Sequence, residues 1–360
     1  MPPWAPLALT TFTAALLALP VTPALYELWK RADATPLPTS RHDGRIANFA
    51  EVFRSRLQPL LPQLERCRNQ RQLVRTCIEG MEVLLVGRDD FDFDPSLTDG
   101  VAAVMLSEAA LIPPGYVVEK DVYTNCGLAL GERAALRAAL CEGDIILGKD
   151  SAVLRWLHAD GSIFLRPGST AYGRLSAGRS IRLAPGCVFE RMSAPLIITV
   201  DDDQNDDQRD SLRAMRDACE PHSAGDGTDM FTSSRPRLRI QGNFILAAGE
   251  TLNANVIATG NVHFGPGARL FGSAKSYKNT VVDEAACVHG SIVSGGTMRL
   301  GPGCFVAGPL MAESDVVVDR GSRVGGPDAL TTISSSGVQI AAGCQLHGTV
   351  WARVRGIVEA

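Results

Sequence analysis

FGPGARLFG (residues 264–272) and LGPGCFVAG (residues 300–308) repeat one pattern: a Pro-Gly corner, a small residue, an aliphatic residue and a second glycine. The two stretches begin 36 residues apart, which is twice an interval of 18 that recurs along the chain. The corner residues at that interval are Gly249, Gly267, Ala285, Gly303 and Gly321, preceded by Asp150, Gly168 and Gly186. The pattern predicts one repeating object, extended backwards by weaker corners at Arg133 and Gly115 and forwards to Gly343 after an insertion of about four residues.

The side chains around each corner keep a constant phase. Two apolar residues that bracket one other residue precede each corner, as in Val262/Phe264 and Met298/Leu300, and this period of two is typical of a strand with one buried face. Another apolar residue follows three positions after the corner, and a second glycine comes two positions later, as in Leu270 and Gly272. That glycine indicates a second bend, where φ is positive or backbones lie close together.

A period of 18 residues sets the geometry of the fold. At about 3.3 Å per residue, one period has a perimeter of at most roughly 60 Å, which suits three sides of about six residues. Successive turns would stack their strands in parallel about 4.8 Å apart. We therefore expect a mainly β chain that forms a three-sided β-helix with 18-residue rungs. A left-handed helix of the hexapeptide-repeat type stays open as an alternative, because an aliphatic residue at every sixth position is partly present.

The nine cysteines form no CxxC pair, and their number is odd. Their spacing fits neither a zinc site nor a disulfide framework. Cys187, Cys304 and Cys344 each follow a corner glycine, at a position held elsewhere by Ser169, Ala268, Ala286 and Ser322. This column of small residues is expected to face the core, where free cysteine acts as a small hydrophobic residue.

The N-terminal segment 2–26 has no charged side chain, which predicts a transmembrane helix within an anchor over residues 1–31. The helix is expected from Trp4 to about Leu19, because Pro20 and Pro23 would bend or end it. Lys30 and Arg31 follow the segment, so the positive-inside rule places the body of a single-pass inner-membrane protein in the cytoplasm. A cleaved signal peptide with export to the periplasm is the alternative, although a basic n-region is missing.

Composition divides the rest of the chain. Residues 32–109 are expected to form a linker and a small helix and strand region that caps the coil, with two short helices separated at Pro59 and Pro62 and strands over 81–87 and 100–107. The β-helix is predicted over residues 110–194 and 243–360. Residues 195–242 interrupt it as an acidic loop with six aspartates between Asp201 and Asp210.

No chemistry-bearing motif stands out. The net charge of −4 and pI near 5.9 argue against nucleic-acid binding. A hexapeptide-type acyltransferase would need a histidine base, and the chain offers His42, His158, His222, His263, His289 and His347. None lies beside an acidic or amide cluster in the sequence, so solvent-facing histidines are expected. We therefore predict no catalytic, cofactor-binding or metal-binding residue, and an envelope-sugar acyltransferase with an inter-subunit cleft remains the alternative function.

The repeats IRLAPGCVF, VHFGPGARLFG, MRLGPGCFVAGPLMA and VQIAAGCQLHGTVWA resemble those of the bactofilins, which are polymer-forming bacterial cytoskeletal proteins. The resemblance covers residues 144–194 and 243–352. It implies a right-handed β-helix without bound nucleotide, whose ends stack into filaments at the membrane and organise envelope or polysaccharide machinery. The expected function is therefore that of a membrane-anchored scaffold that self-associates and binds envelope-biosynthesis proteins.

Overall fold

The computed structural model describes residues 4–22, 26, 46–88, 91, 93, 95–200 and 235–359. The chain divides into two compact units, residues 1–45 and residues 46–360. In the first unit, α1 (Ala5–Ala18) is a helix of 14 residues that ends before Pro20. Proline has no backbone N–H to donate, so it does not continue a helix. No helix in the described ranges is long and apolar enough to cross a membrane, so the transmembrane helix expected from Trp4 to Leu19 is not found.

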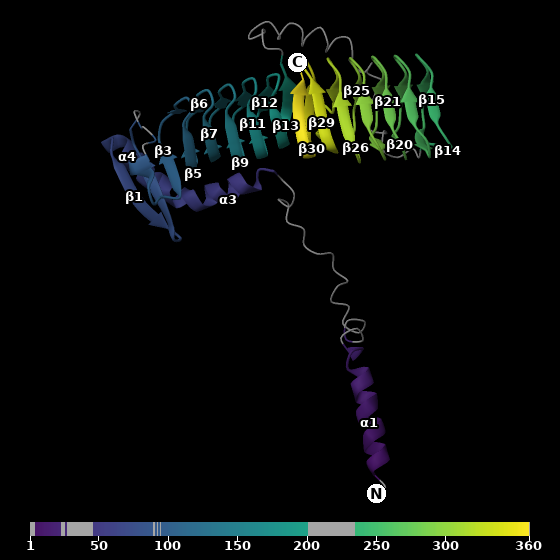
Figure 1. Cartoon of the computed structure of the whole chain (residues 1–360), viewed down its shortest axis with the longest axis horizontal. Coiled ribbons are helices and arrows are strands. Elements are labelled where there is room, and N and C mark those ends of the chain that lie inside the picture. The colour runs from purple at the N-terminus through teal and green to yellow at the C-terminus, as the bar shows by residue number, and fades with distance from the viewer. Residues whose placement is uncertain are drawn as a thin grey trace. The chain divides into compact units, whose positions relative to one another are not determined.

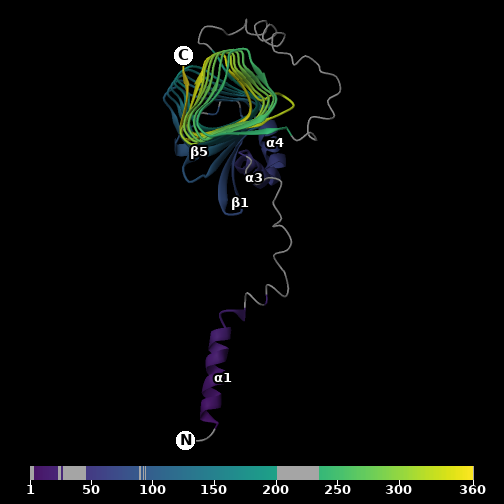
Figure 2. The same ribbon diagram turned by 90° about the vertical axis from the view of Figure 1, so that its right-hand side faces the viewer.

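The second unit is a β-solenoid, a single sheet wound into stacked turns (Figure 1). Seen along its axis, the turns lie over one another in a roughly triangular outline (Figure 2). Its hydrophobic clusters are built from residues after position 45 alone, so this unit contains a complete core of its own. The expected β-helix architecture is confirmed.

The strands fall into an N-terminal and a C-terminal half. The N-terminal half contains β1 (Leu73–Ile78), β2 (Met81–Val86), β3 (Ala103–Leu106), β4 (Ala110–Ile112), β5 (Val117–Thr124), β6 (Leu128–Leu130), β7 (Ala135–Cys141), β8 (Ile145–Leu147), β9 (Ala152–Ala159), β10 (Ile163–Leu165), β11 (Thr170–Ala177), β12 (Ser180–Leu183) and β13 (Val188–Thr199). The C-terminal half contains β14 (Arg237–Ile240), β15 (Phe244–Leu246), β16 (Thr251–Leu252), β17 (Asn255–Ala258), β18 (Val262–Phe264), β19 (Arg269–Leu270), β20 (Ala274–Ser276), β21 (Thr280–Val282), β22 (Cys287–Val288), β23 (Ile292–Ser294), β24 (Met298–Leu300), β25 (Phe305–Val306), β26 (Leu310–Ala312), β27 (Asp315–Val318), β28 (Arg323–Val324), β29 (Thr331–Ala341) and β30 (Gln345–Glu359).

The corner residues explain how each turn closes. They adopt the left-handed backbone conformation without exception: Gly115, Arg133, Asp150, Gly168, Gly186, Gly249, Gly267, Ala285, Gly303, Gly321 and Gly343 all have φ between 55° and 78°. The strand before each corner buries its two bracketing apolar residues; Val262 and Phe264, for example, are at most 1% exposed. Parallel pairing aligns Val262 with Thr280, 18 residues later in the chain. The predicted strand phase is confirmed.

The second glycine of the repeat is required for close backbone approach. A Cβ atom at Gly272 would lie 2.2 Å from the Ala254 carbonyl oxygen, and one at Gly290 would lie 2.3 Å from the Gly272 carbonyl oxygen. Real Cβ atoms are not found at such distances from backbone, so no side chain fits at Gly272 or Gly290. At these two positions, neighbouring turns can approach to the normal strand spacing only because the residue is glycine.

The two halves of the solenoid run in opposite directions along its axis. Both halves contain parallel strands, but β13 and β30 pair antiparallel, with Met192 opposite Val350 and Ser193 opposite Thr349. The last turn of the N-terminal half thus meets the last turn of the C-terminal half. In Figure 1, β30 lies beside β13 in the middle of the solenoid, and β14 and β15 lie at one end.

Side chains from both halves close this joint. Thr199 Oγ1 donates to the Ala341 carbonyl at 2.7 Å and accepts from the Cys344 N–H at 2.9 Å. The Phe189 ring lies over Gly356, where a Cβ atom would come within 2.2 Å of it. The β13·β30 joint therefore seals the core across the change of direction.

The two short helices expected around Pro59 and Pro62 are present, and a third helix of a single turn follows them. α3 (Asn48–Leu57) and α4 (Leu61–Gln70) are joined by the 3-10 turn η2 (Gln58–Leu60), with Pro59 and Pro62 at element starts; α5 (Pro95–Thr98) is a single turn. Phe53, Leu57 and Leu64 pack on the outward side chains of the first strands, including Tyr123. α3 and α4 thus cover outward positions of the strands from β2 to β9.

The two ends of the solenoid differ. At the N-terminal end, β1 pairs antiparallel with β2, and Phe93 is 2% exposed against the core. At the other end, β14 pairs only with β17 among the described strands. Leu238 of β14 aligns with the buried Val256, yet it is 38% exposed because no described turn lies above it. Among the described residues, the N-terminal end is covered and the β14 end is not.

Candidate functional site

A ladder of arginine and tryptophan side chains crosses the β13·β30 joint on the outer face of the solenoid. Strand register aligns Trp156 of β9 with Arg174 of β11, Arg174 with Arg191 of β13, and Arg191 with Trp351 of β30. At the strand spacing of about 4.8 Å, the ladder is roughly 14 Å long. It brings together residues that are distant in the sequence.

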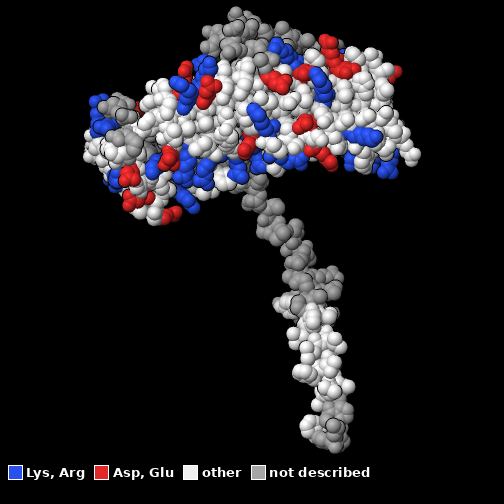
Figure 3. Space-filling view, in the orientation of Figure 1, with Lys and Arg blue, Asp and Glu red and all other residues white. Residues whose placement is uncertain are grey.

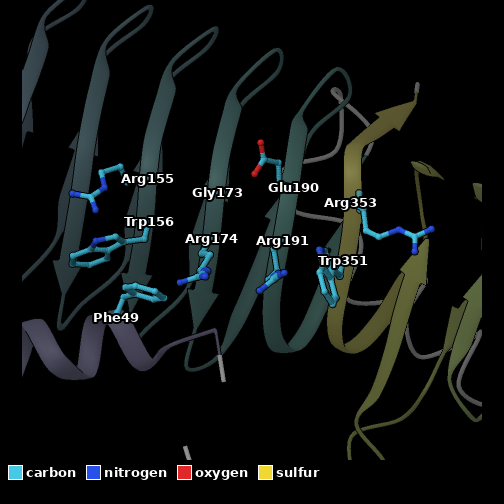
Figure 4. A pocket seen from close by; sticks show the side chains of 10 residues that line it. Phe49, Arg155, Trp156, Gly173, Arg174, Glu190, Arg191, Trp351 and Arg353 are labelled. Carbon is cyan, nitrogen blue, oxygen red and sulfur yellow. The ribbon is translucent and has the colours of Figure 1, made fainter. Parts of the chain in front are cut away.

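The ladder forms the floor of a cavity of about 490 Å³, shown in Figure 4. Arg155 and Arg353 line it together with the two arginines of the ladder, and Glu190 is the only carboxylate in its lining. Phe49 of α3 closes it beside Trp156. We call this feature the arginine cavity; it is a site of strong positive charge.

The aromatic rings hold two of the guanidinium groups in place. The Arg174 guanidinium carbon lies 3.8 Å from the Phe49 ring centroid, and that of Arg191 lies 3.9 Å from the Trp351 ring centroid. A guanidinium stacked on a ring keeps its N–H groups in its own plane, where they remain available to a ligand. Trp156 is itself held by Phe53, with ring centroids 5.3 Å apart in an edge-to-face arrangement.

The positive charges of this cavity are poorly compensated. Among the described residues, no carboxylate lies within ion-pair distance of Arg155, Arg174 or Arg191. Burial and then the neighbouring charge of Arg191 lower the pKa of Arg174 from its ordinary value. An anion placed between the two guanidinium groups would relieve this repulsion.

A polar network links α3 to the solenoid beside the cavity. His158 Nε2 lies 3.1 Å from Asp160 Oδ1, and Nδ1 lies 2.7 Å from Ser176 Oγ. A carboxylate only accepts, so Nε2 carries the proton and Nδ1 accepts from the serine hydroxyl. Arg54 of α3 donates to both oxygens of Asp160 at 2.6 and 2.8 Å. Burial lowers the pKa of His158, outweighing the opposite effect of Asp160, and so favours the neutral ring.

This serine, histidine and aspartate have the hydrogen-bond order of a nucleophilic triad. Ser176 is only 5% exposed, which leaves a substrate little approach to its hydroxyl. Both ring nitrogens of His158 are occupied by protein groups. The arrangement is therefore suited to fixing α3 on the solenoid face, and we assign it that positioning role.

The remaining histidines depart from the solvent-facing expectation to different degrees. His347 is 8% exposed and its Nδ1 lies 2.8 Å from the Pro195 carbonyl across the joint, while His289 stacks on Phe271 with centroids 4.5 Å apart. His263 pairs with Asp283 at 2.6 Å with its side chain 43% exposed. The expectation of exposure is wrong for His347 and for His158, whose side chain is 13% exposed. His42 and His222 lie outside the described residues.

The column of small residues after the corner glycines faces the core, as expected. Cys187, Cys304 and Cys344 are at most 1% exposed, and Ser169, Ala268, Ala286 and Ser322 are equally buried. Burial raises the pKa of Cys187 and of Cys304 to about 12 and that of Cys344 to about 11. Within the described ranges, no group of three or more histidine, cysteine or acidic side chains is placed to hold a metal ion.

Sequence reasoning did not find the arginine cavity. Its residues belong to α3, β9, β11, β13 and β30, and they are brought together by the antiparallel joint. The periodic signal marks inward positions, whereas these side chains occupy outward ones, whose identity the repeat leaves free. The aspartate-rich stretch between Asp201 and Asp210 lies outside the described residues.

Comparisons of the chain with protein-family models, with curated proteins and with solved structures gave no match.

Proposed function

We propose that this chain is a structural scaffold, a rigid β-solenoid that self-associates through its open end. The observation that carries the proposal is the turn formed by β14, β15 and β16, which pairs with a described turn on one side only. Leu238 occupies a core position there and is 38% exposed, and the Ile240 and Phe244 side chains are only partly buried. Exposed strand edges with apolar core residues pair readily with other strands.

The chain itself shows how two such ends fit together. At the β13·β30 joint, two terminal turns of the same solenoid type pair antiparallel and bury Met192 and Val350 between them. A second copy of the chain could join β14 to β14 in the same antiparallel manner. Such a contact is isologous, because each copy contributes the same surface.

The charges on β14 limit the strength of this association between two copies. Arg237 and Arg239 are exposed on β14, and two copies would bring these like charges close together. Charged residues on edge strands are a known device against uncontrolled pairing. The association is therefore weak at low salt and becomes stronger when salt screens the repulsion.

The bactofilin-like repeats support the same role, and with it a right-handed coil of 18-residue rungs. We further propose that the N-terminal segment attaches the scaffold to a membrane. The exposed apolar side chains of α1, which include Leu9, Phe12 and Leu16, support this, as does the lack of charge over residues 2–26. Lys30 and Arg31 favour the cytoplasmic side for the body, where it would organise envelope or polysaccharide machinery.

The test is light scattering on size-exclusion fractions of residues 46–360 over a range of protein concentrations, at low and at high salt. We expect a particle of twice the monomer mass that is favoured by concentration and by salt. Leu238→Glu should abolish it, because it places a charge where the partner's core residues pack.

Leu111→Glu is the matched control, since Leu111 is 65% exposed on β4 near the covered end. It should associate like the unmodified protein. Equal association of Leu238→Glu, or a monomer under every condition, would contradict the proposal.

A further inference from the structure

We infer that the arginine cavity binds the phosphate group of an organic phosphate ester. The inference does not depend on self-association, because the cavity lies at the β13·β30 joint and the open end lies at β14. It rests on the geometry of the guanidinium groups, on the charge balance of the lining and on the size of the cavity.

The two central arginines occupy one column of the ladder on adjacent strands, about 4.8 Å apart along the solenoid. Arg174 and Arg191 lie opposite each other on neighbouring parallel strands. Their guanidinium groups rest on the Phe49 and Trp351 rings, so both are oriented before a ligand arrives. Planar guanidinium forks bind phosphate oxygens two at a time, and a phosphate has enough acceptor positions for both forks.

The charge balance favours phosphate over a single carboxylate. Four arginines line the cavity against one carboxylate, that of Glu190. One carboxylate is satisfied by one arginine fork, which would leave the second guanidinium facing a like charge. A phosphate carries more negative charge and more acceptor positions than a carboxylate, so it can satisfy both guanidinium forks.

The surroundings of the cavity are also basic. Figure 3 shows Lys and Arg side chains gathered along the lower edge of the solenoid. This edge attracts anions over a distance of about a Debye length, or roughly 8 Å at physiological ionic strength. A cavity of about 490 Å³ has room for the phosphate and part of the organic group that carries it.

Two sources could present such a group, a soluble phosphate ester or a phospholipid headgroup, and the experiment separates them. Residues 46–360, which contain a complete core of their own, are titrated with inorganic pyrophosphate in a calorimeter at physiological salt. The same protein is then sedimented with phosphatidylcholine vesicles that contain or lack phosphatidic acid. Binding of pyrophosphate alone assigns a soluble ester, and binding of phosphatidic acid vesicles assigns a lipid headgroup; either result supports the inference.

The double variant Arg174→Gln/Arg191→Gln should weaken binding by at least about 100-fold, since it removes two charge-assisted forks. Arg182→Gln is the control, because Arg182 lies on another column of the solenoid beside Phe164. Circular dichroism melts identify any variant that has lost its fold, and Arg174→Lys/Arg191→Lys then reports the need for the fork, with charge kept. Failure to bind either probe, equal loss in Arg182→Gln, or equal binding of citrate in place of pyrophosphate would overturn the inference.

Discussion

At the scale of single residues, the corner position governs how the chain turns. Arg133, Asp150 and Ala285 adopt φ of 55° without being glycine, which costs conformational energy that the stacked neighbours must offset. The glycines elsewhere in this column adopt the same conformation without that cost. The repeat is therefore strict in backbone conformation and looser in residue type.

Core and surface positions in one turn should respond very differently to charge. Val306 is fully buried, and Val306→Asp would place a carboxylate in the core, so we expect a loss of more than about 4 kcal/mol in the free energy of unfolding. Arg299 is exposed and pairs with Asp319 at 3.0 Å, and Arg299→Asp should cost at most about 1 kcal/mol. Denaturant titrations by circular dichroism give both values, and equal tolerance would contradict the assigned phase.

Thiol reactivity should follow burial. In a Cys126→Ser/Cys219→Ser/Cys287→Ser background, the exposed Cys77 should react quickly with a thiol reagent. The core thiols Cys187, Cys304 and Cys344 should react only when the solenoid unfolds. The raised pKa of each buried thiol and its lack of access act in the same direction. Adding Cys77→Ser should remove the fast reaction; its persistence would show that a core cysteine is accessible.

At the scale of secondary-structure elements, the repeat pattern predicts neither the pairing of β13 with β30 nor the packing of α3 on the solenoid. β13 and β30 are the last strands of the two halves. They have 12 and 15 residues, more than any other described strand, and each turns a corner of the coil. Their antiparallel pairing needs a close fit between side chains of two distant segments. Gly356 is one such position, because a Cβ atom there would lie 2.2 Å from the Phe189 ring of the opposite half.

Enlarging Gly356 should therefore weaken the joint. Gly356→Val would drive two methyl groups into the Phe189 ring, and we expect a loss of about 1–3 kcal/mol in the free energy of unfolding. Gly326→Ala is the control, since a Cβ atom there meets nothing within 4 Å. Equal stability of Gly356→Val and the unmodified protein, measured by denaturant titration, would contradict the pairing of β13 with β30.

Three histidines make the stability of the elements depend on pH. Burial lowers the pKa of His158, His289 and His347 below the ordinary value of 6.5. The unfolded chain then binds protons more readily than the folded one, so stability is fully present above pH 6.5 and falls as the pH drops below it.

The free energy of unfolding of residues 46–360 should thus decrease between about pH 8 and about pH 5. The triple variant His158→Gln/His289→Gln/His347→Gln should show a flatter dependence over that range. A wild-type profile that rises toward acid pH would be the opposite sign and would contradict the burial of these rings.

At the scale of the whole molecule, the reversal of direction determines what the solenoid can assemble into. The last turn of the N-terminal half meets the last turn of the C-terminal half in the middle of the solenoid. Its two ends are therefore formed by β1, with Phe93, and by β14. Only the β14 end exposes core positions among the described strands. An isologous contact through one end closes after two copies.

Electron microscopy of residues 46–360 at high salt should therefore show particles of twice the single-solenoid length and no long filaments. The bactofilin resemblance alone would lead to filaments, since both ends of a plain coil can stack. Filaments many solenoids long would show that the β1 end also pairs, and would contradict the closed pair.

The sequence by itself determined the coil: an interval of 18 residues, apolar alternation and small residues after each corner predict stacked parallel strands, and the buried Val262, Phe264 and Cys304 agree with it. Such local patterns are readable because every turn meets the same neighbours through the same backbone geometry. The strands predicted over residues 81–87 and 100–107 and the short helices around Pro59 were found from local signals too, namely apolar runs and the positions of the prolines.

Only the tertiary structure decided the antiparallel joint, the β14 end that no described turn covers, and the arginine cavity. The cavity joins residues as far apart as Phe49 and Trp351, on outward positions that the core pattern does not constrain. The direction in which the C-terminal half runs depends on which turn fits against β13, and that fit is a property of surfaces, such as Phe189 against Gly356. Periodicity reports what each residue does within its own turn, whereas the sites of this protein arise where different turns and a helix meet.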